Sequence, residues 1–165
     1  MGEEREAAGV DKAALTAWMD GAGLAGGPIE RLELLSGGSQ NVLARFERGG
    51  RAFVLRRPPL HLRANSNETM RREARVLGAL AGSDVPHPAL IAACGDENVL
   101  GAAFYLMEPI DGFNPVNGLP ASHHDAAVQR RMGLALVEGL AALHAVDHVA
   151  AGLGDFGRTE GFLER

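Results

Sequence analysis

The sequence contains one cysteine, one lysine and few aromatic residues, and it has no long apolar run. The single Cys94 excludes a disulfide within the chain, and its apolar surroundings predict an inert, buried thiol. No apolar stretch approaches the roughly 18 residues of a membrane span, and the acidic start MGEEREAAGVDK has no hydrophobic segment typical of a secretory signal. At 165 residues the chain is long enough for one hydrophobic core. We therefore expect a cytoplasmic globular protein with no membrane partner.

Arginine supplies nearly all of the positive charge, and it is concentrated in one segment. Between Arg45 and Arg75 nine arginines stand against three glutamates, although the whole chain carries a net charge of −5. A solvated basic face would explain this segment as well as a binding site does. Nucleic acid is not the expected partner, because no aromatic residues alternate with these arginines and the chain is acidic overall. A local phosphate ligand fits the pattern better.

Residues 32–58 have the pattern of a glycine loop between two strands, followed by a third strand. Val42, Ala44 and Phe46 recur with a period of two, and the run Arg48-Gly49-Gly50-Arg51 predicts a tight hairpin. Adjacent glycines let backbone N–H groups approach an anion closely. The loop comprises Ser36, Gly37, Gly38, Ser39, Gln40 and Asn41. With the basic pair Arg56-Arg57 at the end of the third strand, the segment predicts a phosphate-binding arrangement.

Two helices are expected on either side of these strands. Asp11 is expected to cap the first helix, which ends at the glycines that follow residue 20. The polar stretch 65–67 offers three side chains that could cap a second helix, which runs to about Leu80. Proline and glycine residues between 82 and 88 end that helix.

The second half of the chain predicts two more strands and one long helix. Apolar runs at 89–94 and 102–107, with a turn at 95–98 between them, indicate an antiparallel pair. Ser122 with Asp125 resembles a capping box for a long helix with an apolar stripe. Five antiparallel strands with one helix inserted after the third form an α+β layer. This order disfavours a dinucleotide-binding fingerprint, in which a strand runs directly into a helix.

Five segments in this order resemble the aminoglycoside phosphotransferase and choline-kinase-like family, which shares the protein-kinase fold. They are LSGGSQNVLARF, FVLRRPP, MRREARVLGAL, YLMEPIDG and LVEGLAALHAVD. The resemblance covers about residues 29–165 and is strongest to the phosphotransferase domains associated with acyl-CoA dehydrogenases. It implies a kinase-like N-lobe at 29–108, preceded by a helix and linker at 1–28 and followed at 109–165 by a hinge and the start of a truncated helical C-lobe. The implied function is the ATP-binding part of a small-molecule kinase.

The resemblance also implies roles for individual residues. Arg56 falls where the family keeps its phosphate-pairing lysine, and Glu73 falls where a helix carboxylate pairs with that cation. Arginine keeps the charge and offers a bidentate fork, although its geometry differs from that of lysine. In the hinge, the Glu108 carbonyl and the Ile110 N–H would bind the adenine edge, and Met107 would line the pocket behind it. The glycine loop would cover the phosphates.

The groups that perform phosphoryl transfer in this family are missing from the sequence. The family requires an Asp base in a His-Gly-Asp loop and a second Asp that holds Mg²⁺, and none of the six histidines precedes Gly-Asp. We expect both groups beyond Arg165, so no catalytic or metal-binding residue is assigned within this chain. Asp155-Phe156-Gly157 follows the long helix too soon to be the kinase metal motif. The chain alone is expected to be inactive.

Two functions remain open at this point. The first is a kinase that transfers the γ-phosphate of ATP, with Mg²⁺, to a hydroxylated small molecule, with a functional link to an acyl-CoA dehydrogenase. The second is a nucleotide-sensing or scaffolding domain that keeps the fold without the chemistry. The substituted Arg56 and the missing catalytic loop permit the second, and a His-Gly-Asp loop in further sequence would favour the first.

Overall fold

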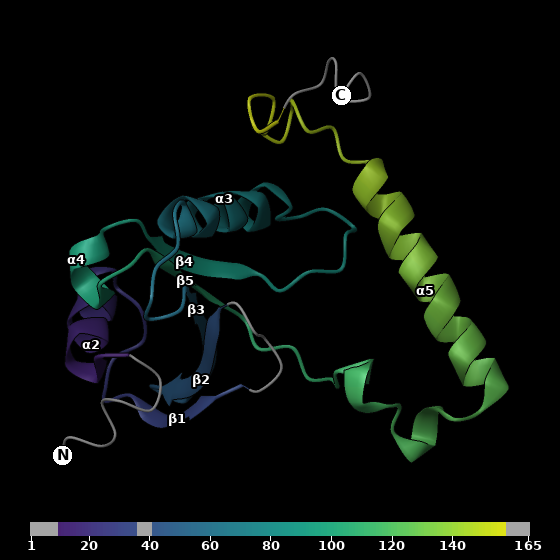
Figure 1. The fold of residues 1–165 in the computed structure, drawn as a ribbon, viewed down its shortest axis with the longest axis horizontal. Helices are drawn as coiled ribbons and strands as arrows, with labels where there is room; N and C mark the ends of the chain where they lie inside the picture. Colours follow the sequence, from purple (N-terminus) through teal and green to yellow (C-terminus); the bar gives the residue numbers. More distant parts are fainter. Residues whose placement is uncertain (1–9, 36–40, 158–165) are drawn as a thin grey trace. The chain divides into compact units, whose positions relative to one another are not determined.

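The computed structural model describes residues 10–35 and 41–157 of the chain (Figure 1). It divides into two compact units. The first comprises Met1–Arg75 and Pro88–Asp111, and the second comprises Val76–His87 and Gly112–Arg165.

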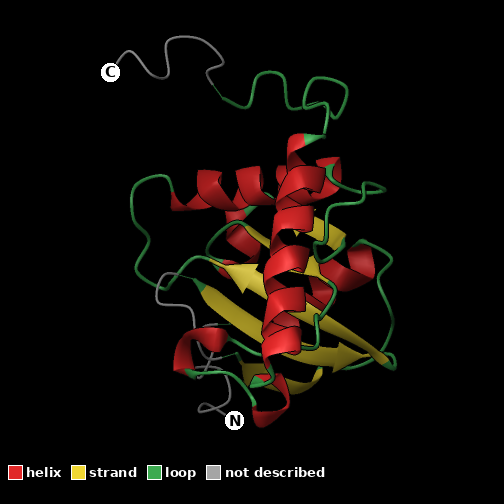
Figure 2. Ribbon diagram, turned by 90° about the vertical axis from the view of Figure 1, so that its right-hand side faces the viewer, coloured by secondary structure: helices red, strands yellow, loops and turns green. Residues whose placement is uncertain are grey.

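The first unit is built on one five-stranded antiparallel sheet, seen as yellow arrows in Figure 2. Its strands are β1 (Glu30–Leu34), β2 (Val42–Arg48), β3 (Arg51–Arg57), β4 (Leu90–Cys94) and β5 (Phe104–Met107), in the spatial order β1-β2-β3-β5-β4. All neighbouring strands are antiparallel. The predicted α+β class and the five-stranded sheet are therefore confirmed.

The hairpin between β2 and β3 forms as the sequence predicts. Arg48 pairs with Arg51 across the turn, and Gly49 and Gly50 have φ values of 55° and 74°. Two consecutive residues with positive φ are the requirement of the type I′ turn that matches the twist of a hairpin. At Gly49 a side chain is excluded for a second reason, because a Cβ atom would lie 2.7 Å from the carbonyl oxygen of Gly26.

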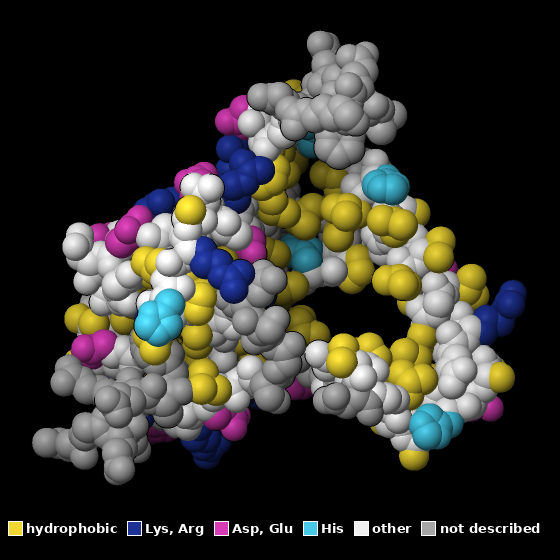
Figure 3. Space-filling model, in the orientation of Figure 1, with side chains coloured by type: hydrophobic (Ala, Val, Ile, Leu, Met, Phe, Trp, Pro, Cys, Tyr) yellow, Lys and Arg dark blue, Asp and Glu magenta, His cyan; other side chains and the backbone are white. Residues whose placement is uncertain are grey.

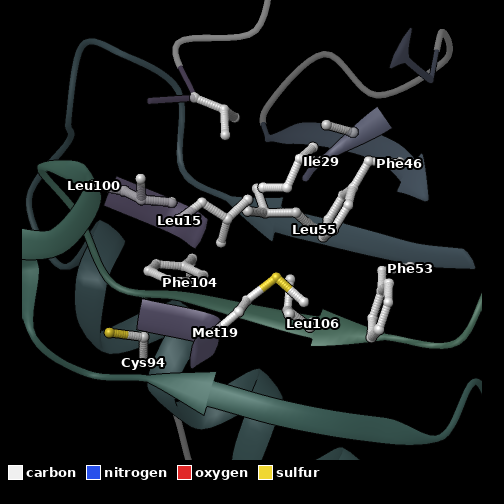
Figure 4. Packing of buried hydrophobic residues seen from close by; sticks show 12 residues of the cluster. Leu15, Met19, Ile29, Phe46, Phe53, Leu55, Cys94, Leu100, Phe104 and Leu106 are labelled. Atoms are coloured by element: carbon white, nitrogen blue, oxygen red, sulfur yellow. The ribbon is translucent and has the colours of Figure 1, made fainter. Parts of the chain in front are cut away.

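One face of the sheet forms the hydrophobic core. The alternating residues Ala44 and Phe46 are buried there, and the Phe46 ring stacks on that of Phe53 with centroids 5.3 Å apart. The helix α2 (Lys12–Gly21) covers this face with Leu15 and Met19 (Figure 4). Asp11 caps α2 as predicted, since its carboxylate accepts hydrogen bonds from the N–H groups of Ala13 and Ala14 at 2.9 and 3.1 Å. Burial of this face accounts for the period of two in β2.

Two further helices belong to the sheet region. The helix α3 (Ser66–Ala79) follows β3 as predicted and buries Met70 and Ala74. A short helix, α4 (Glu97–Leu100), occupies the segment for which the sequence predicts a turn. Asp96 caps α4 by accepting from the Asn98 N–H at 2.9 Å, and Gly101 ends it with φ 76°. The predicted turn is therefore wrong in detail, because an aspartate cap and a left-handed glycine are sufficient for one helical turn.

The second unit contains two short 3₁₀ turns, η1 (Pro115–Asn117) and η2 (Ala121–His123), and the helix α5 (Ala126–His144). The predicted cap at Ser122 is wrong. Asp125 caps α5 by accepting from two backbone N–H groups, and its short carboxylate suits that position better than the N3 position of a capping box. No residue of α5 is buried, and Leu136 is 77% exposed. Hydrophobic atoms accordingly run along this helix in Figure 3. Within the described ranges, no helix has both the length and the apolar character needed to span a bilayer.

Candidate phosphate-binding site

The candidate site lies on the face of the sheet opposite the core. Residues directly opposite each other on antiparallel strands point to the same face. Leu43, Arg56 and Tyr105 are opposite one another on β2, β3 and β5, and they form one such row. The neighbouring row contains Val54 and Met107. Strand pairing therefore places a cation beside an apolar surface.

Arg56 and Glu73 form the predicted ion pair between β3 and α3. Arg56 Nε donates to Glu73 Oε2 at 2.8 Å, and Arg56 Nη2 donates to Oε1 at 3.3 Å. The side chains are 28% and 31% exposed, so the pair is partly screened by solvent and accessible to a ligand. This bidentate arrangement fixes the plane of the guanidinium group. The pair itself is confirmed, whereas its role in nucleotide binding remains a prediction.

Tyr105 is the third member of this cluster, and the sequence analysis did not identify it. Its hydroxyl donates to Glu73 Oε2 at 3.1 Å, and the residue is only 4% exposed. Burial raises the pKa of the Tyr105 phenol, the positive charge of Arg56 opposes this, and the charge and hydrogen bond of Glu73 add to it. The hydroxyl is therefore protonated at neutral pH and acts as a donor. The sequence carries one indication of this position: in YLMEPIDG, Tyr105 precedes Met107 by two residues, so both side chains lie on the same face of the strand.

Met107, which the hinge prediction already includes, belongs to an apolar surface beside Arg56 whose other members were not predicted. Strand pairing adds Leu35, Leu43 and Val54 to this surface. Val54 is 4% exposed, so the accessible part of the surface comes from Leu35, Leu43 and Met107. The Leu35 N–H donates to the Leu43 carbonyl at 2.9 Å, which continues the pairing of β1 with β2, and Val54 is opposite Met107. The alternation in the sequence drew attention to Val42, Ala44 and Phe46 on the core face. Leu43 alternates with these residues, so its side chain lies on the other face of the sheet. Only the pairing of β2 with β3 shows that it lies opposite Arg56.

The predicted glycine loop lies mostly outside the described residues. Ser36 to Gln40 are not described, while Asn41 immediately precedes β2. The described flanks still restrict where the loop attaches, because Leu35 and Leu43 are hydrogen bonded to each other and Leu43 is opposite Arg56. Leu35, before the loop, therefore lies in the row that contains Arg56, and Val42, the first residue of β2, is opposite Arg57.

The predicted hinge continues directly from β5. The Glu108 N–H donates to the Ala89 carbonyl at 3.0 Å, so the segment remains paired to the residue before β4. Ile110 is 68% exposed. The Glu108 carboxylate lies 3.6 Å from Arg51 Nη2, and Asp111 lies 3.6 Å from Arg45 Nη1. Two solvent-exposed ion pairs thus link Glu108 and Asp111 to the sheet, and such pairs contribute little to stability.

Within residues 10–35 and 41–157, no group of three or more His, Cys, Asp or Glu side chains is arranged to hold a metal ion. Cys94 is buried and its Sγ–H donates weakly to the Asp96 carbonyl at 3.6 Å, and desolvation raises the pKa of the thiol. The described part of the chain therefore offers a cation and an apolar surface to a ligand.

Comparison with known proteins gives a family match over most of the chain. Residues 31–165 match the family model described as "Phosphotransferase enzyme family". The chain is 32% identical over 143 residues to acyl-CoA dehydrogenase family member 10 of Mus musculus, which covers 84% of this chain and 13% of the mouse protein. It is 35% identical over 117 residues to a probable acyl-CoA dehydrogenase, IBR3, of Arabidopsis thaliana, covering 68% and 14% of the two chains. The chain thus spans a small part of these relatives.

Solved structures with the same fold carry the name aminoglycoside phosphotransferase. A protein of Ralstonia eutropha assigned to that group is 35% identical, with a TM-score of 0.65 over 90% of this chain and 42% of that chain. The aminoglycoside phosphotransferase APH(4)-Ia is 18% identical, with a TM-score of 0.52 over 83% of this chain and 40% of that chain. The second likeness concerns the fold alone.

Proposed function

The chain belongs to the phosphotransferase enzyme family, and on this premise we propose that it forms the ATP-binding part of a small-molecule kinase. The reaction is transfer of the γ-phosphate of ATP to a hydroxyl group of the acceptor. The observation that carries this proposal is the partly exposed Arg56–Glu73 pair between β3 and α3. It provides a fixed positive charge on the ligand-accessible face of the sheet.

Arg56 is the proposed phosphate-binding group. A guanidinium has five N–H donors in a rigid fork and stays charged at all physiological pH values. It can hold a carboxylate by one edge and a phosphate oxygen by another. The Glu73 contact uses Nε and Nη2, and it orients the fork. The glycine loop would add backbone N–H groups from the adjacent end of β1 and β2.

The apolar surface of Leu35, Leu43, Val54 and Met107 is the proposed seat of the adenine ring. Ligand sites for flat heterocycles are mostly apolar with a few polar groups that fix orientation. Here the hinge would supply them, through the carbonyl of Glu108 and the N–H of Ile110, which lie on one side of an extended backbone. Pro109 between them has no N–H to contribute.

Mg²⁺ and the catalytic base are proposed to be held by residues outside the described ranges. Phosphoryl transfer in this family uses an Asp base and Asp or Asn ligands to the metal, and the described residues provide no such set. The exposed apolar side chains of α5 support further helical sequence of the same polypeptide packing there.

The relatives' names also lead us to propose a hydroxyacyl compound as the acceptor class.

A non-catalytic nucleotide-binding domain is the second candidate. The replacement of the family's lysine by Arg56 and the absence of His-Gly-Asp from this sequence both permit it. The two candidates predict the same ATP affinity for this chain. They differ in whether a protein carrying the whole phosphotransferase region transfers phosphate.

Calorimetry with MgATP tests the binding proposal. Arg56→Met should weaken binding by about tenfold to a hundredfold, the equivalent of one lost charged hydrogen bond. The matched control is Arg31→Met, which removes an exposed arginine paired with Glu47 on the sheet and should leave binding unchanged. Equal affinity of Arg56→Met and wild type would contradict the assignment.

Phosphoryl transfer is tested separately with ATP, Mg²⁺ and a panel of hydroxyacyl and other hydroxylated acceptors. The 165-residue chain should show no turnover above buffer, whereas the protein with the whole region should be active. Metal-dependent turnover by the chain alone would show that it contains its own base. Nucleotide binding without any transfer by the longer protein would favour the non-catalytic candidate.

A further inference from the structure

The Glu73 carboxylate is held from two sides on the same oxygen atom. Oε2 accepts from Arg56 Nε at 2.8 Å and from the Tyr105 hydroxyl at 3.1 Å. Arg56 and Tyr105 are opposite each other on the adjacent strands β3 and β5, while Glu73 comes from α3. Side chains from β3, α3 and β5 therefore meet at one oxygen.

The three side chains differ greatly in freedom. Arginine and glutamate are long and flexible, and their pair is about 30% exposed, so water competes for both partners. Tyr105 is 4% exposed, has two side-chain torsions and is fixed inside the sheet. The buried phenol is therefore the least mobile of the three groups that meet at Oε2.

The phenol is also suited to act as a constant donor. Burial raises its pKa, Arg56 lowers it, and Glu73 raises it further, so the hydroxyl keeps its proton at physiological pH. It is therefore available as a donor to the Glu73 carboxylate at physiological pH.

We propose that Tyr105 is a positioning residue for phosphate binding, which acts on Arg56 through Glu73. This inference rests on the proposed nucleotide-binding function. An arginine at this position has to present one edge of a planar fork, whereas a lysine presents a compact charge that requires less orientation. Tyr105 supplies that orientation by anchoring the carboxylate that holds the fork. Its effect is confined to the phosphate-dependent part of nucleotide affinity.

A purely structural tyrosine would behave differently. If the hydroxyl served only as a hydrogen-bonded group in the protein interior, its removal would lower the free energy of unfolding. It would also weaken the binding of every ligand on this face equally. If it positions Arg56, its removal weakens ligands that carry phosphate and spares adenosine, which has none. Adenosine uses the apolar surface and the hinge alone, so it separates the two roles.

The test is a binding comparison on wild type, Tyr105→Phe, Glu73→Ala and the double variant, with MgATP and adenosine as ligands. Tyr105→Phe removes one oxygen and leaves the ring in place. We expect MgATP affinity to fall by about threefold to tenfold, the equivalent of one hydrogen bond, with adenosine affinity unchanged. In the Glu73→Ala background, loss of the hydroxyl should have no further effect, since the group it acts through is gone. Thermal unfolding of each variant confirms that it is folded.

Each alternative outcome has a distinct meaning. Equal MgATP affinity for wild type and Tyr105→Phe would overturn the role of Tyr105 and leave the proposed function intact. Equal losses for MgATP and adenosine, or losses that multiply in the double variant, would show that Tyr105 does not act through Glu73. If wild type bound neither ligand, the proposed nucleotide site would itself be wrong, and the role of Tyr105 with it.

Discussion

The two faces of the sheet use the same residue type for opposite purposes. Arg48 lies on the core face, is 1% exposed, and is held by the carboxylate of Asp20 and by the carbonyl of Gly27, to which its Nε donates at 2.7 Å. Arg56 lies on the other face, is partly exposed and is held by the carboxylate of Glu73. A buried arginine that donates to main-chain carbonyls as well as to a carboxylate stabilises the fold, whereas a partly exposed arginine oriented by a carboxylate can receive an anion. Burial and partners, and not the residue type, indicate the role.

The largest expected effect is on the core face. Arg48→Met should lower the free energy of unfolding by about 3 kcal/mol, because it leaves the Gly27 carbonyl without its donor and releases α2 from β2. Arg56→Met should lower it by less than about 1 kcal/mol, as for other solvent-screened pairs. Urea denaturation of both variants measures the difference. Equal losses would remove the distinction between the two faces.

The hairpin that joins β2 to β3 gives the next effect. Gly49→Ala should cost about 2 kcal/mol or more, because an alanine there would have positive φ and its Cβ would clash with the Gly26 carbonyl at 2.7 Å. Gly50→Ala is the matched control. It has the same backbone strain with no atom within 4 Å, and it should cost about 1 kcal/mol. If Gly49→Ala and Gly50→Ala were equally stable, the close approach of Gly26 to Gly49 would not contribute to the cost of the substitution.

These results also indicate how much the sequence could predict. Local patterns were sufficient for the sheet, because alternation in β2 and the two glycines of the hairpin act over a few residues. The Arg56–Glu73 pair came from the family resemblance and its order of segments. Local pattern puts Tyr105 on the same face of its strand as Met107, but its position beside Arg56 follows only from the pairing of β3 with β5, which are separated in the sequence by α3, β4 and α4.

Other differences arose where two short-range signals competed. Serine and aspartate side chains can both cap a helix, and in the structure Asp125, which immediately precedes α5, is the cap. The segment after β4 has turn residues, yet one aspartate cap was sufficient for the helix α4. Signals of similar strength leave element ends uncertain, while the elements themselves are well predicted.

The face of the sheet that carries Arg56 is tested most directly at the hinge. Ile110→Pro removes the N–H proposed to bind adenine and should weaken MgATP binding by about tenfold, the equivalent of one hydrogen bond. Pro109→Ala is the control, since the backbone nitrogen at that position makes no contact with adenine in this assignment. Calorimetry on the protein with the whole phosphotransferase region measures both. Equal ATP affinity for wild type and Ile110→Pro would show that the hinge does not bind adenine.

The smallest effect appears only at alkaline pH and isolates Tyr105. The phenol pKa is about 10 in an unfolded chain and is raised in the folded protein, chiefly by burial. Above about pH 10 the unfolded chain therefore releases this proton while the folded protein keeps it, so the free energy of unfolding falls as pH rises. Cys94, whose thiol pKa is also raised, contributes in the same direction.

Tyr105→Phe removes only the phenol contribution, so denaturation curves between pH 9 and about pH 11 should show a shallower loss of stability for the variant. Because Tyr105 is the one tyrosine in the chain, the ultraviolet absorbance of tyrosinate reports its titration without interference. Parallel stability curves, or a titration near pH 10 in the folded protein, would mean that the phenol is not enclosed between the sheet and Glu73.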